Sequence, residues 1–157
     1  MLRTRPTVHE DLARLVEWET DPDTSVWLGE TGRDWHERAL ADPNQDHILA
    51  ERDGALSGFA VLAGIRRTDR VLELRRMVVS PAQRGAGRGR ALLRAALACA
   101  YEHHGAGRVW LDVKAHNRRA RALYESEGFA VTDVLAGAVG EPDGTATDLV
   151  IMVHRPR

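Results

Sequence analysis

Apolar and polar residues follow two different periods along the chain, and these periods predict where helices and strands lie. Apolar residues recur at helical spacing over residues 12–19 and predict a first helix. Thr7 and Glu10 have the spacing of a capping box, so we expect their side chains to begin that helix. A short strand over residues 2–5 is expected before it, and a second helix over residues 33–41 after an Asp-Pro-Asp break.

Short apolar runs bounded by glycine, proline and aspartate predict the remaining strands. These strands cover residues 47–51, 56–63, 71–79, 109–113, 129–135 and 148–153. An Asp-Gly pair joins the first two of them as a hairpin. Helical periodicity predicts one further helix over residues 91–104 and a shorter one that begins near Asn117 and ends at Gly128. Residues 136–147 are expected to form a loop.

The order of these elements predicts an α/β fold, more narrowly an α+β mixed sheet. Three consecutive strands in the first half favour antiparallel pairing, whereas a strand, a glycine-rich loop, a helix and a strand over residues 71–113 predict one βαβ crossover. A chain of 157 residues is long enough to bury a substantial core. We expect a single domain over residues 1–157.

The composition argues against two classes of partner. The chain is 43% hydrophobic and 29% charged, and its net charge of −1 gives no overall field that would attract nucleic acid or a membrane surface. No stretch approaches the ~20 apolar residues of a membrane span, and the N-terminus has no apolar leader segment. We therefore expect no nucleic acid and no membrane among the partners, although arginines are concentrated locally over residues 66–94.

Cys99 is the only cysteine, so the chain cannot form an internal disulfide, which fits a reducing, cytoplasmic location. Because Cys99 lies in a helical run rich in alanine and leucine, we interpret it as a buried, unreactive thiol rather than a nucleophile. The histidines His36, His103, His104 and His116 do not have the spacing of metal ligands. We predict no metal.

The most informative stretch is the strand over residues 71–79 followed by a glycine-spaced basic loop and a helix. This arrangement gathers backbone N–H groups and the positive end of a helix, and it predicts an anion site, most simply for phosphate. The dinucleotide motif G-x-G-x-x-G is not met, because Arg90 stands at the position of its last glycine. The P-loop motif needs a lysine in the loop, and the only lysine of the chain is Lys114. The loop instead matches the pattern [RQ]-x-x-G-x-[GA] over residues 84–89.

A second pattern, N-x-x-A-x-x-L-Y-x-x-x-G-F, follows a predicted strand. It is met by Asn117, Ala120, Leu123, Tyr124, Gly128 and Phe129. With the glycine-spaced loop in the correct order before it, this segment resembles the GNAT superfamily of N-acetyltransferases. The resemblance implies a GNAT-like fold, with a central, mixed and mostly antiparallel sheet flanked by helices and a V-shaped splay between its two central strands.

The resemblance also implies acetyl-CoA as the acyl donor, bound in that splay. Backbone groups of Met77, Val78 and Val79 would bond the pantetheine arm, and an N–H near the end of this strand would stabilise the oxyanion. The pyrophosphate would be held by Arg84, Gly85, Ala86, Gly87, Arg88, Gly89 and Arg90. Each of these arginines could equally be a solvated surface charge. Asn117 would contact the pantetheine arm, cap the following helix, or do both.

Two residues are implied as catalytic groups. Tyr124 would be the general acid that protonates the departing thiolate, or else a half-buried aromatic residue. Glu73 would be the general base through water, or else the ion-pair partner of Arg75. Alternation places Glu73 on the same face as Val79 unless a β-bulge intervenes. Trp27 would form part of the acceptor site, or else pack in the core.

These residues predict an enzyme that transfers an acetyl group from acetyl-CoA to a primary amine of a small molecule or peptide by direct attack in a ternary complex. A non-catalytic CoA-binding or regulatory domain of the same fold is the alternative, and a nucleic-acid module using the local arginines is disfavoured because no aromatic platform accompanies them. The acceptor stays open because fold does not determine substrate. The resemblance also implies a possible homodimer.

Overall fold

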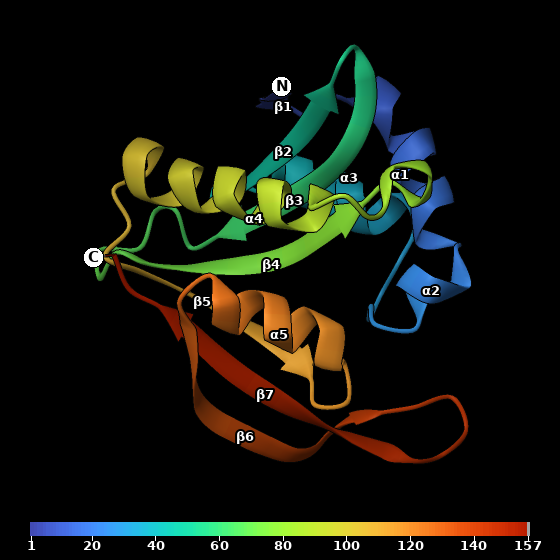
Figure 1. Cartoon of the computed structure of the whole chain (residues 1–157), viewed down its shortest axis with the longest axis vertical. Helices are drawn as coiled ribbons and strands as arrows, with labels where there is room; N and C mark the ends of the chain where they lie inside the picture. The colour runs from blue at the N-terminus through green and yellow to red at the C-terminus, as the bar shows by residue number, and fades with distance from the viewer. Residues whose placement is uncertain (157) are drawn as a thin grey trace.

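The computed structural model describes residues 1–156, which build one seven-stranded sheet with helices on both faces (Figure 1). In spatial order the strands are β1 (Leu2–Pro6), β2 (Gln45–Arg52), β3 (Ala55–Ala63), β4 (Val71–Val79), β5 (Arg108–Lys114), β7 (Ala146–His154) and β6 (Phe129–Gly140). Among these strands only β4 and β5 pair in parallel, and the other neighbours are antiparallel. The mixed, mostly antiparallel sheet and its single βαβ crossover are therefore confirmed.

The helices lie in two groups on opposite faces of the sheet. They are α1 (Leu12–Glu19), α2 (Pro22–Ser25), α3 (Arg33–Ala41), α4 (Arg88–Ala98) and α5 (Arg118–Ser126), with 3-10 turns at His9–Asp11 and Pro81–Gln83 and a π-helical turn at Cys99–His103. Side chains of α4 and α5 pack into one hydrophobic cluster, whereas those of α1 and α3 pack into another. None of these helices is long and apolar enough to span a membrane.

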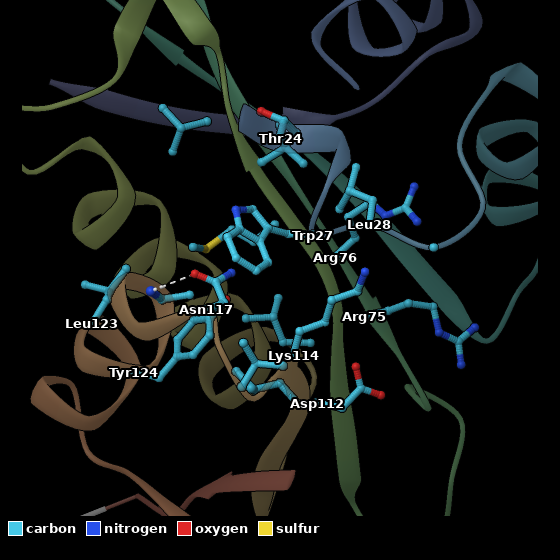
Figure 2. Close-up of a pocket in the computed structure, with 18 of the residues that line it drawn as sticks. Thr24, Trp27, Leu28, Arg75, Arg76, Asp112, Lys114, Asn117, Leu123 and Tyr124 are labelled. Atoms are coloured by element: carbon cyan, nitrogen blue, oxygen red, sulfur yellow. Dashed lines mark hydrogen bonds between the residues drawn. The ribbon is translucent and has the colours of Figure 1, made fainter. Parts of the chain in front are cut away.

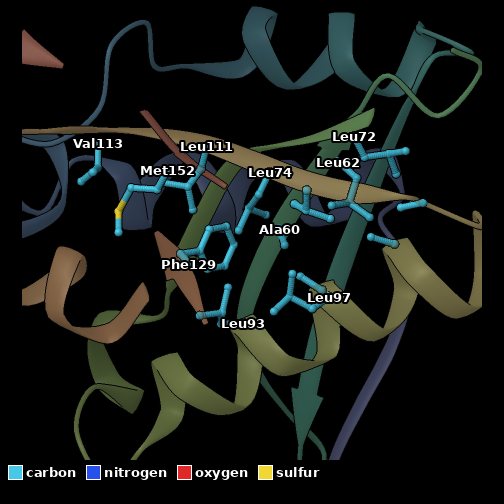
Figure 3. Packing of buried hydrophobic residues seen from close by; sticks show 14 of the residues in the cluster. Ala60, Leu62, Leu72, Leu74, Leu93, Leu97, Leu111, Val113, Phe129 and Met152 are labelled. Atoms are coloured by element: carbon cyan, nitrogen blue, oxygen red, sulfur yellow. The ribbon is translucent and has the colours of Figure 1, made fainter. Parts of the chain in front are cut away.

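Strand β3 shows why this arrangement follows from the sequence. Its residues 59–63 are apolar without alternation, which is the pattern of a strand covered on both faces. Ala60 and Leu62 face the cluster under α4, where Leu93 and Leu97 meet them (Figure 3). Phe59 and Val61 point to the opposite side, toward α1 and α3. A strand in the middle of the sheet thus contributes to both cores.

The predicted capping box at the first helix is wrong. The Thr7 hydroxyl bonds Nδ1 of His47 at 2.8 Å, and the Thr7 backbone N–H bonds the His47 carbonyl, so residue 7 still belongs to the sheet edge. The helical segment begins two residues later, at His9, and the Asp11 carboxylate accepts from the Val8 N–H at 2.8 Å. The acceptor at the helix start is therefore an aspartate one position after Glu10.

Three other boundaries differ from the predicted ones. Residues 22–25 form the short helix α2 where a break was expected, because Asp21 caps it and Pro22 suits a first helical position. Helix α4 starts at Arg88 rather than at residue 91, since Gly89 in its first turn weakens the helical pattern. The predicted loop over residues 136–147 is mostly strand, as β6 and β7 continue to a turn closed by the Glu141 N–H and the Thr145 carbonyl.

A chain of buried polar side chains crosses the core between α1, α3 and the sheet. Glu19 Oε1 lies 2.9 Å from His36 Nε2, and His36 Nδ1 lies 2.9 Å from His47 Nε2. On the other side, Arg76 Nη1 donates to Glu19 Oε2 at 2.7 Å. Each ring can donate from one nitrogen toward Glu19 and accept at the other from the Thr7 side, so every member of the series has a partner.

Burial affects the charges of His47, Glu19 and Arg76 in this series of polar side chains. Removal from water is the main reason why the pKa of His47 falls to about 3, with the charges of His36 and Arg76 acting in the same direction. His47 therefore stays neutral at pH 7. The side chains of Glu19 and Arg76 are 1% and 6% exposed, so this carboxylate and guanidinium neutralise each other inside the protein. Loss of one member would leave the other as an unpaired buried charge.

Substitution Glu19→Gln should lower the free energy of unfolding by about 3 kcal/mol, because Arg76 loses its buried counter-charge. The matched control is Glu37→Gln, which removes an exposed pair with Arg33 and should cost less than about 1 kcal/mol. Urea titrations of the three proteins measure both values. Equal losses in the two variants would show that the buried pair has no special role.

Candidate functional site

Strands β4 and β5 separate after three residues of pairing. Their parallel register runs from Val71 opposite Arg108 to Glu73 opposite Trp110 and then stops. Beyond this point β4 remains paired with β3 only, while β5 pairs with β7 as far as Lys114 (Figure 1). Residues 74–79 of β4 thus have a free backbone edge facing β5. The V-shaped splay implied by the sequence resemblance is confirmed.

A cavity of about 390 Å³ occupies the splay (Figure 2). Its wall is formed by the end of β4, by β5, by α5, and by α2 with the loop that follows it. The polar and aromatic side chains in the wall include Thr24, Trp27, Arg75, Arg76, Arg84, Asp112, Lys114, Asn117 and Tyr124. Met77, Val78 and Val79 also line it. The cavity therefore brings Arg84 of the first sequence pattern together with Asn117 and Tyr124 of the second, whereas residues 85–90 do not line it.

The glycine-spaced loop has a backbone that few other sequences could adopt. Gly85, Ala86 and Gly87 have φ values of 86°, 53° and 75°, so three successive residues are left-handed. Gly87 is the N-cap of α4, which begins at Arg88. The first turn of α4 leaves N–H groups without intrahelical partners, and the helix dipole adds positive potential at the same end. This geometry suits a phosphate group.

The three arginines of the loop have different surroundings. Arg84 Nη2 lies 2.6 Å from Asp21 Oδ2, which ties the loop to the start of α2. Arg90 Nη1 lies 3.0 Å from Glu127 Oε2, toward the end of α5. Within residues 1–156, Arg88 forms no ion pair and keeps its charge uncompensated. Arg84 and Arg90 are thus paired with carboxylates, whereas Arg88 is the loop arginine whose charge is available to a ligand.

Tyr124 projects from α5 into the cavity, and its ring packs on Phe129 with centroids 5.6 Å apart. Burial raises the pKa of Tyr124 to about 12, and the negative charge of Asp112 acts in the same direction. The phenol is therefore a proton donor at pH 7. Asn117 caps α5 by accepting from the Ala120 N–H at 3.3 Å, as the dashed line in Figure 2 shows.

Glu73 stands apart from these groups. It is the last residue of β4 that pairs with β5, and its Oε1 lies 2.8 Å from Arg75 Nη2. It does not line the cavity. The expectation that alternate residues from Glu73 to Val79 share a face is wrong. A β-bulge opposite the Val61–Leu62 step inserts Arg75 as an extra residue and reverses the alternation.

Asp112 is the carboxylate that sequence reasoning missed. It lies on β5 and lines the cavity, near Arg75 and Lys114 in Figure 2. Asp112 is exposed to solvent, but the cavity walls remove its carboxylate in part from water and raise its pKa, although the charge of Arg75 acts in the opposite direction. The available signal was an acidic residue inside the otherwise apolar run over residues 109–113. Such a residue in a strand at the sheet centre is a candidate for chemistry.

Lys114 and Trp27 shape the outer part of the cavity. Lys114 Nζ donates to the Val26 carbonyl at 2.9 Å and lies 2.8 Å from Glu141 Oε1, so it joins the loop after α2 to the β6–β7 hairpin. The Trp27 ring lies against His116, with centroids 4.9 Å apart, and lines the cavity. Trp35, in contrast, packs against the core beneath the Arg76 guanidinium and does not line the cavity.

Comparison with known proteins agrees with the family resemblance seen in the two sequence patterns. The family model described as Acetyltransferase (GNAT) family matches residues 12–129. An uncharacterized N-acetyltransferase of Mycobacterium tuberculosis is 39% identical over 92 residues, which cover 59% of this chain and 57% of that relative's length. The [ribosomal protein bS18]-alanine N-acetyltransferase of Escherichia coli K12 is 32% identical over 124 residues, covering 75% of this chain and 78% of that protein.

Solved structures show the same fold at lower sequence identity. Spermidine N-acetyltransferase from Vibrio cholerae, solved with CoA and spermine, has a TM-score of 0.87 and is 20% identical. That match covers 98% of this chain and 95% of the other. The similarity extends over the whole sheet, including the region where β4 and β5 separate.

Gly58 allows β3 to approach the end of β4 closely, and its replacement should disturb the cavity. A Cβ at this position would lie 2.6 Å from the Val78 carbonyl oxygen and 2.9 Å from Leu92 Cδ2. Gly58→Ala should therefore cost about 1–3 kcal/mol of stability and weaken CoA binding roughly tenfold. Urea titration and calorimetric titration with CoA measure the two effects.

The control is Gly140→Ala on strand β6, because a Cβ there would meet no atom within 4 Å beyond its chain neighbours. It should leave CoA affinity unchanged. If Gly58→Ala bound CoA as tightly as the unsubstituted protein, the end of β4 would not be part of the ligand site.

Proposed function

The chain belongs to the acetyltransferase (GNAT) family, and we propose that it transfers an acetyl group from acetyl-CoA to a primary amine by direct attack within a ternary complex. The observation that carries this proposal is the splay cavity, which has Arg84 of the phosphate-type loop at one end and a partly buried Tyr124 of raised pKa in its wall. A ligand that is long, carries a phosphate at one end and has amides along its length fits both features.

In the proposed complex the pantetheine arm lies along the free edge of β4. The peptide groups of Met77, Val78 and Val79 would bond its amides as a neighbouring strand would. Asn117 would contact the same arm from the start of α5. The pyrophosphate would lie on Arg84, Gly85, Ala86, Gly87, Arg88, Gly89 and Arg90. Because Arg88 has no carboxylate partner among residues 1–156, it would supply most of the side-chain charge.

The reaction then needs one bond made and one broken. The neutral amine attacks the thioester carbonyl, and the N–H of Val78 or Val79 stabilises the oxyanion that forms. The C–S bond breaks, and Tyr124 protonates the departing thiolate to give CoA. The carboxylate takes one proton from the ammonium form before the attack and passes it to solvent. The attacked nitrogen then loses one further proton by the same route, and Tyr124 regains its proton from solvent. No covalent enzyme intermediate is involved, since burial raises the pKa of Cys99 to about 11 and this thiol lies outside the cavity.

Asp112 is the stronger candidate for the carboxylate that takes the proton. It lines the cavity and its pKa is raised, so it is a better base than an ordinary aspartate. Glu73, the residue predicted from the sequence, is held by Arg75 and would have to act through water from outside the cavity. The two assignments lead to opposite results in a pair of amide variants.

The alternative is a CoA-binding or regulatory domain that does not catalyse transfer. It needs the loop and the edge of β4 but gives no role to a buried tyrosine and a carboxylate of raised pKa in the same cavity. Release of free CoA thiol from acetyl-CoA in the presence of amines, and its absence without them, separates the two functions.

The acceptor is proposed to be a small-molecule or peptide amine that enters beside Trp27. The named relatives act on both classes, a polyamine in one and a ribosomal protein in another. An amine panel should therefore contain spermidine and peptides with a free N-terminus. A cytoplasmic location is proposed from the single reduced cysteine. A homodimer is supported by the exposed Val131, Val134 and Leu135 on the edge strand β6.

Asp112→Asn should lower kcat/KM for the amine roughly 100-fold at neutral pH, because the ammonium form is no longer deprotonated in the cavity. The loss should shrink as the pH approaches the pKa of the free amine, where solvent supplies the neutral form. Glu73→Gln is the matched control and should retain most of the activity. The reverse pattern would identify Glu73 as the base, and full activity of both variants would exclude a carboxylate base.

Tyr124→Phe should lower kcat roughly 100-fold and leave the affinity for CoA almost unchanged, since only the proton donor is removed. The control is Tyr101→Phe, which changes the only other tyrosine, whose hydroxyl bonds the His154 ring and carbonyl away from the cavity. Steady-state rates and CoA titrations measure the two quantities. An unchanged kcat in Tyr124→Phe would contradict the acid role.

A further inference from the structure

Three potential metal ligands of different types converge at the end of α4 that is remote from the glycine-spaced loop. They are Asp46 from β2, Cys99 from the first residue of the π-helical turn, and His104 just after that turn. One ligand atom from each lies within 4.8 Å of the others. The group shares no residue with the splay cavity. The acetyl-transfer chemistry therefore leaves it unexplained.

The π-helical turn is what brings Cys99 and His104 to the same side. The His104 backbone N–H bonds the Cys99 carbonyl at 3.1 Å, which is a bond between residues five apart. In an α-helix residues five apart point in clearly different directions, because each residue rotates by ~100°. The wider turn aligns them, and both side chains then reach Asp46 across the start of β2. Such turns are rare and are often found at functional sites.

Two of the three ligand-to-ligand distances can be compared with those of a tetrahedral site. Asp46 Oδ2 lies 3.7 Å from Cys99 Sγ and 2.8 Å from His104 Nε2. Around tetrahedral Zn²⁺, ordinary zinc–ligand bond lengths place neighbouring ligand atoms roughly 3.4–3.6 Å apart. The sulfur–oxygen distance already fits, and the nitrogen–oxygen pair would have to open by about 0.6 Å. The side chains of His104 and Asp46 are 15% and 26% exposed, which leaves a fourth position open to water.

The charges of the three ligands also match a divalent cation. A thiolate and a carboxylate together carry two negative charges, and a neutral imidazole adds a nitrogen donor without charge. A thiolate, an imidazole and one carboxylate are the ligand set that favours zinc over calcium or magnesium, which prefer oxygen alone. Binding would release the thiol proton that Cys99 now directs toward Asp46.

We propose that Asp46, Cys99 and His104 form a site for a zinc-type divalent cation that joins the start of β2 to the C-terminal end of the α4 segment. This replaces the sequence prediction of no metal, which rested on histidine spacing alone and could not bring together residues more than fifty positions apart. Because the cation would bind the folded chain only, it would raise stability in proportion to its occupancy. Its position outside the cavity gives it a structural role rather than one in acetyl transfer.

Cobalt(II) and zinc(II) as the bare ions test the site directly. Because Cys99 is the only cysteine, thiolate-to-cobalt charge-transfer absorption can come from this position alone. The expected result is one cobalt per chain with that absorption, its displacement by zinc, a higher midpoint of thermal unfolding with zinc, and alkylation of Cys99 slowed roughly tenfold. Absence of the absorption together with unslowed alkylation would overturn the proposal, and this readout needs no variant.

Variants then identify the ligands. Asp46→Asn and His104→Gln should each weaken cobalt binding by at least roughly 10–100-fold. His103→Gln is the matched control, because this neighbouring histidine is exposed and is not one of the three ligands, and it should bind cobalt like the unsubstituted protein. Undiminished binding in both ligand variants, or a loss in His103→Gln alone, would overturn the assignment. Circular dichroism confirms that each variant is folded.

Discussion

The separation of β4 from β5 is the constraint on which the site depends. After Glu73, β4 stays paired with β3 and β5 stays paired with β7, while the two edges that face each other no longer pair. The exposed edge of β4 carries peptide groups that need partners, and unpaired buried peptide groups are costly. A ligand with its own amides is the simplest partner. The sheet topology thus creates a binding edge before any side chain is considered.

The β-bulge at Arg75 decides what faces this edge. By adding one residue, it turns Arg76 toward α1 and α3, where Glu19 neutralises it and the Trp35 ring lies 3.8 Å below the guanidinium. Arg76 also donates to the Glu30 carbonyl at 2.6 Å, which fixes the chain just beyond the cavity wall. The buried polar side chains therefore do more than fill the core. Through the bond from Arg76 to Glu30 they fix the loop after α2, on the side of the cavity proposed for the acceptor.

The parts that sequence reasoning found are those encoded by residues close together in the chain. The loop pattern over residues 84–89 and the α5 pattern that includes Asn117 and Tyr124 are local. The α5 segment has the structure expected, and the loop differs only in that Arg88 and Gly89 already belong to α4. The parts that it missed depend on distant contacts. Asp112 lines the cavity because β4 and β5 separate in the folded sheet. Asp46 lies near Cys99 because β2 packs against the end of the α4 segment. Periodicity cannot show a bulge or a π-helical turn, because each changes the period itself.

The same distinction separates the two ends of the cavity. The cofactor end is built from one continuous stretch of loop and helix plus a strand edge, so its geometry follows from local backbone preferences. The end proposed for the acceptor is formed by the loop after α2, by β5 and by the β6–β7 hairpin, which Lys114 joins through the Val26 carbonyl and Glu141. A change in hairpin length or in the α2 loop would alter that end without touching the phosphate loop. Acceptor choice can therefore vary while the donor stays the same, which is why the donor follows from the sequence patterns and the acceptor must be measured.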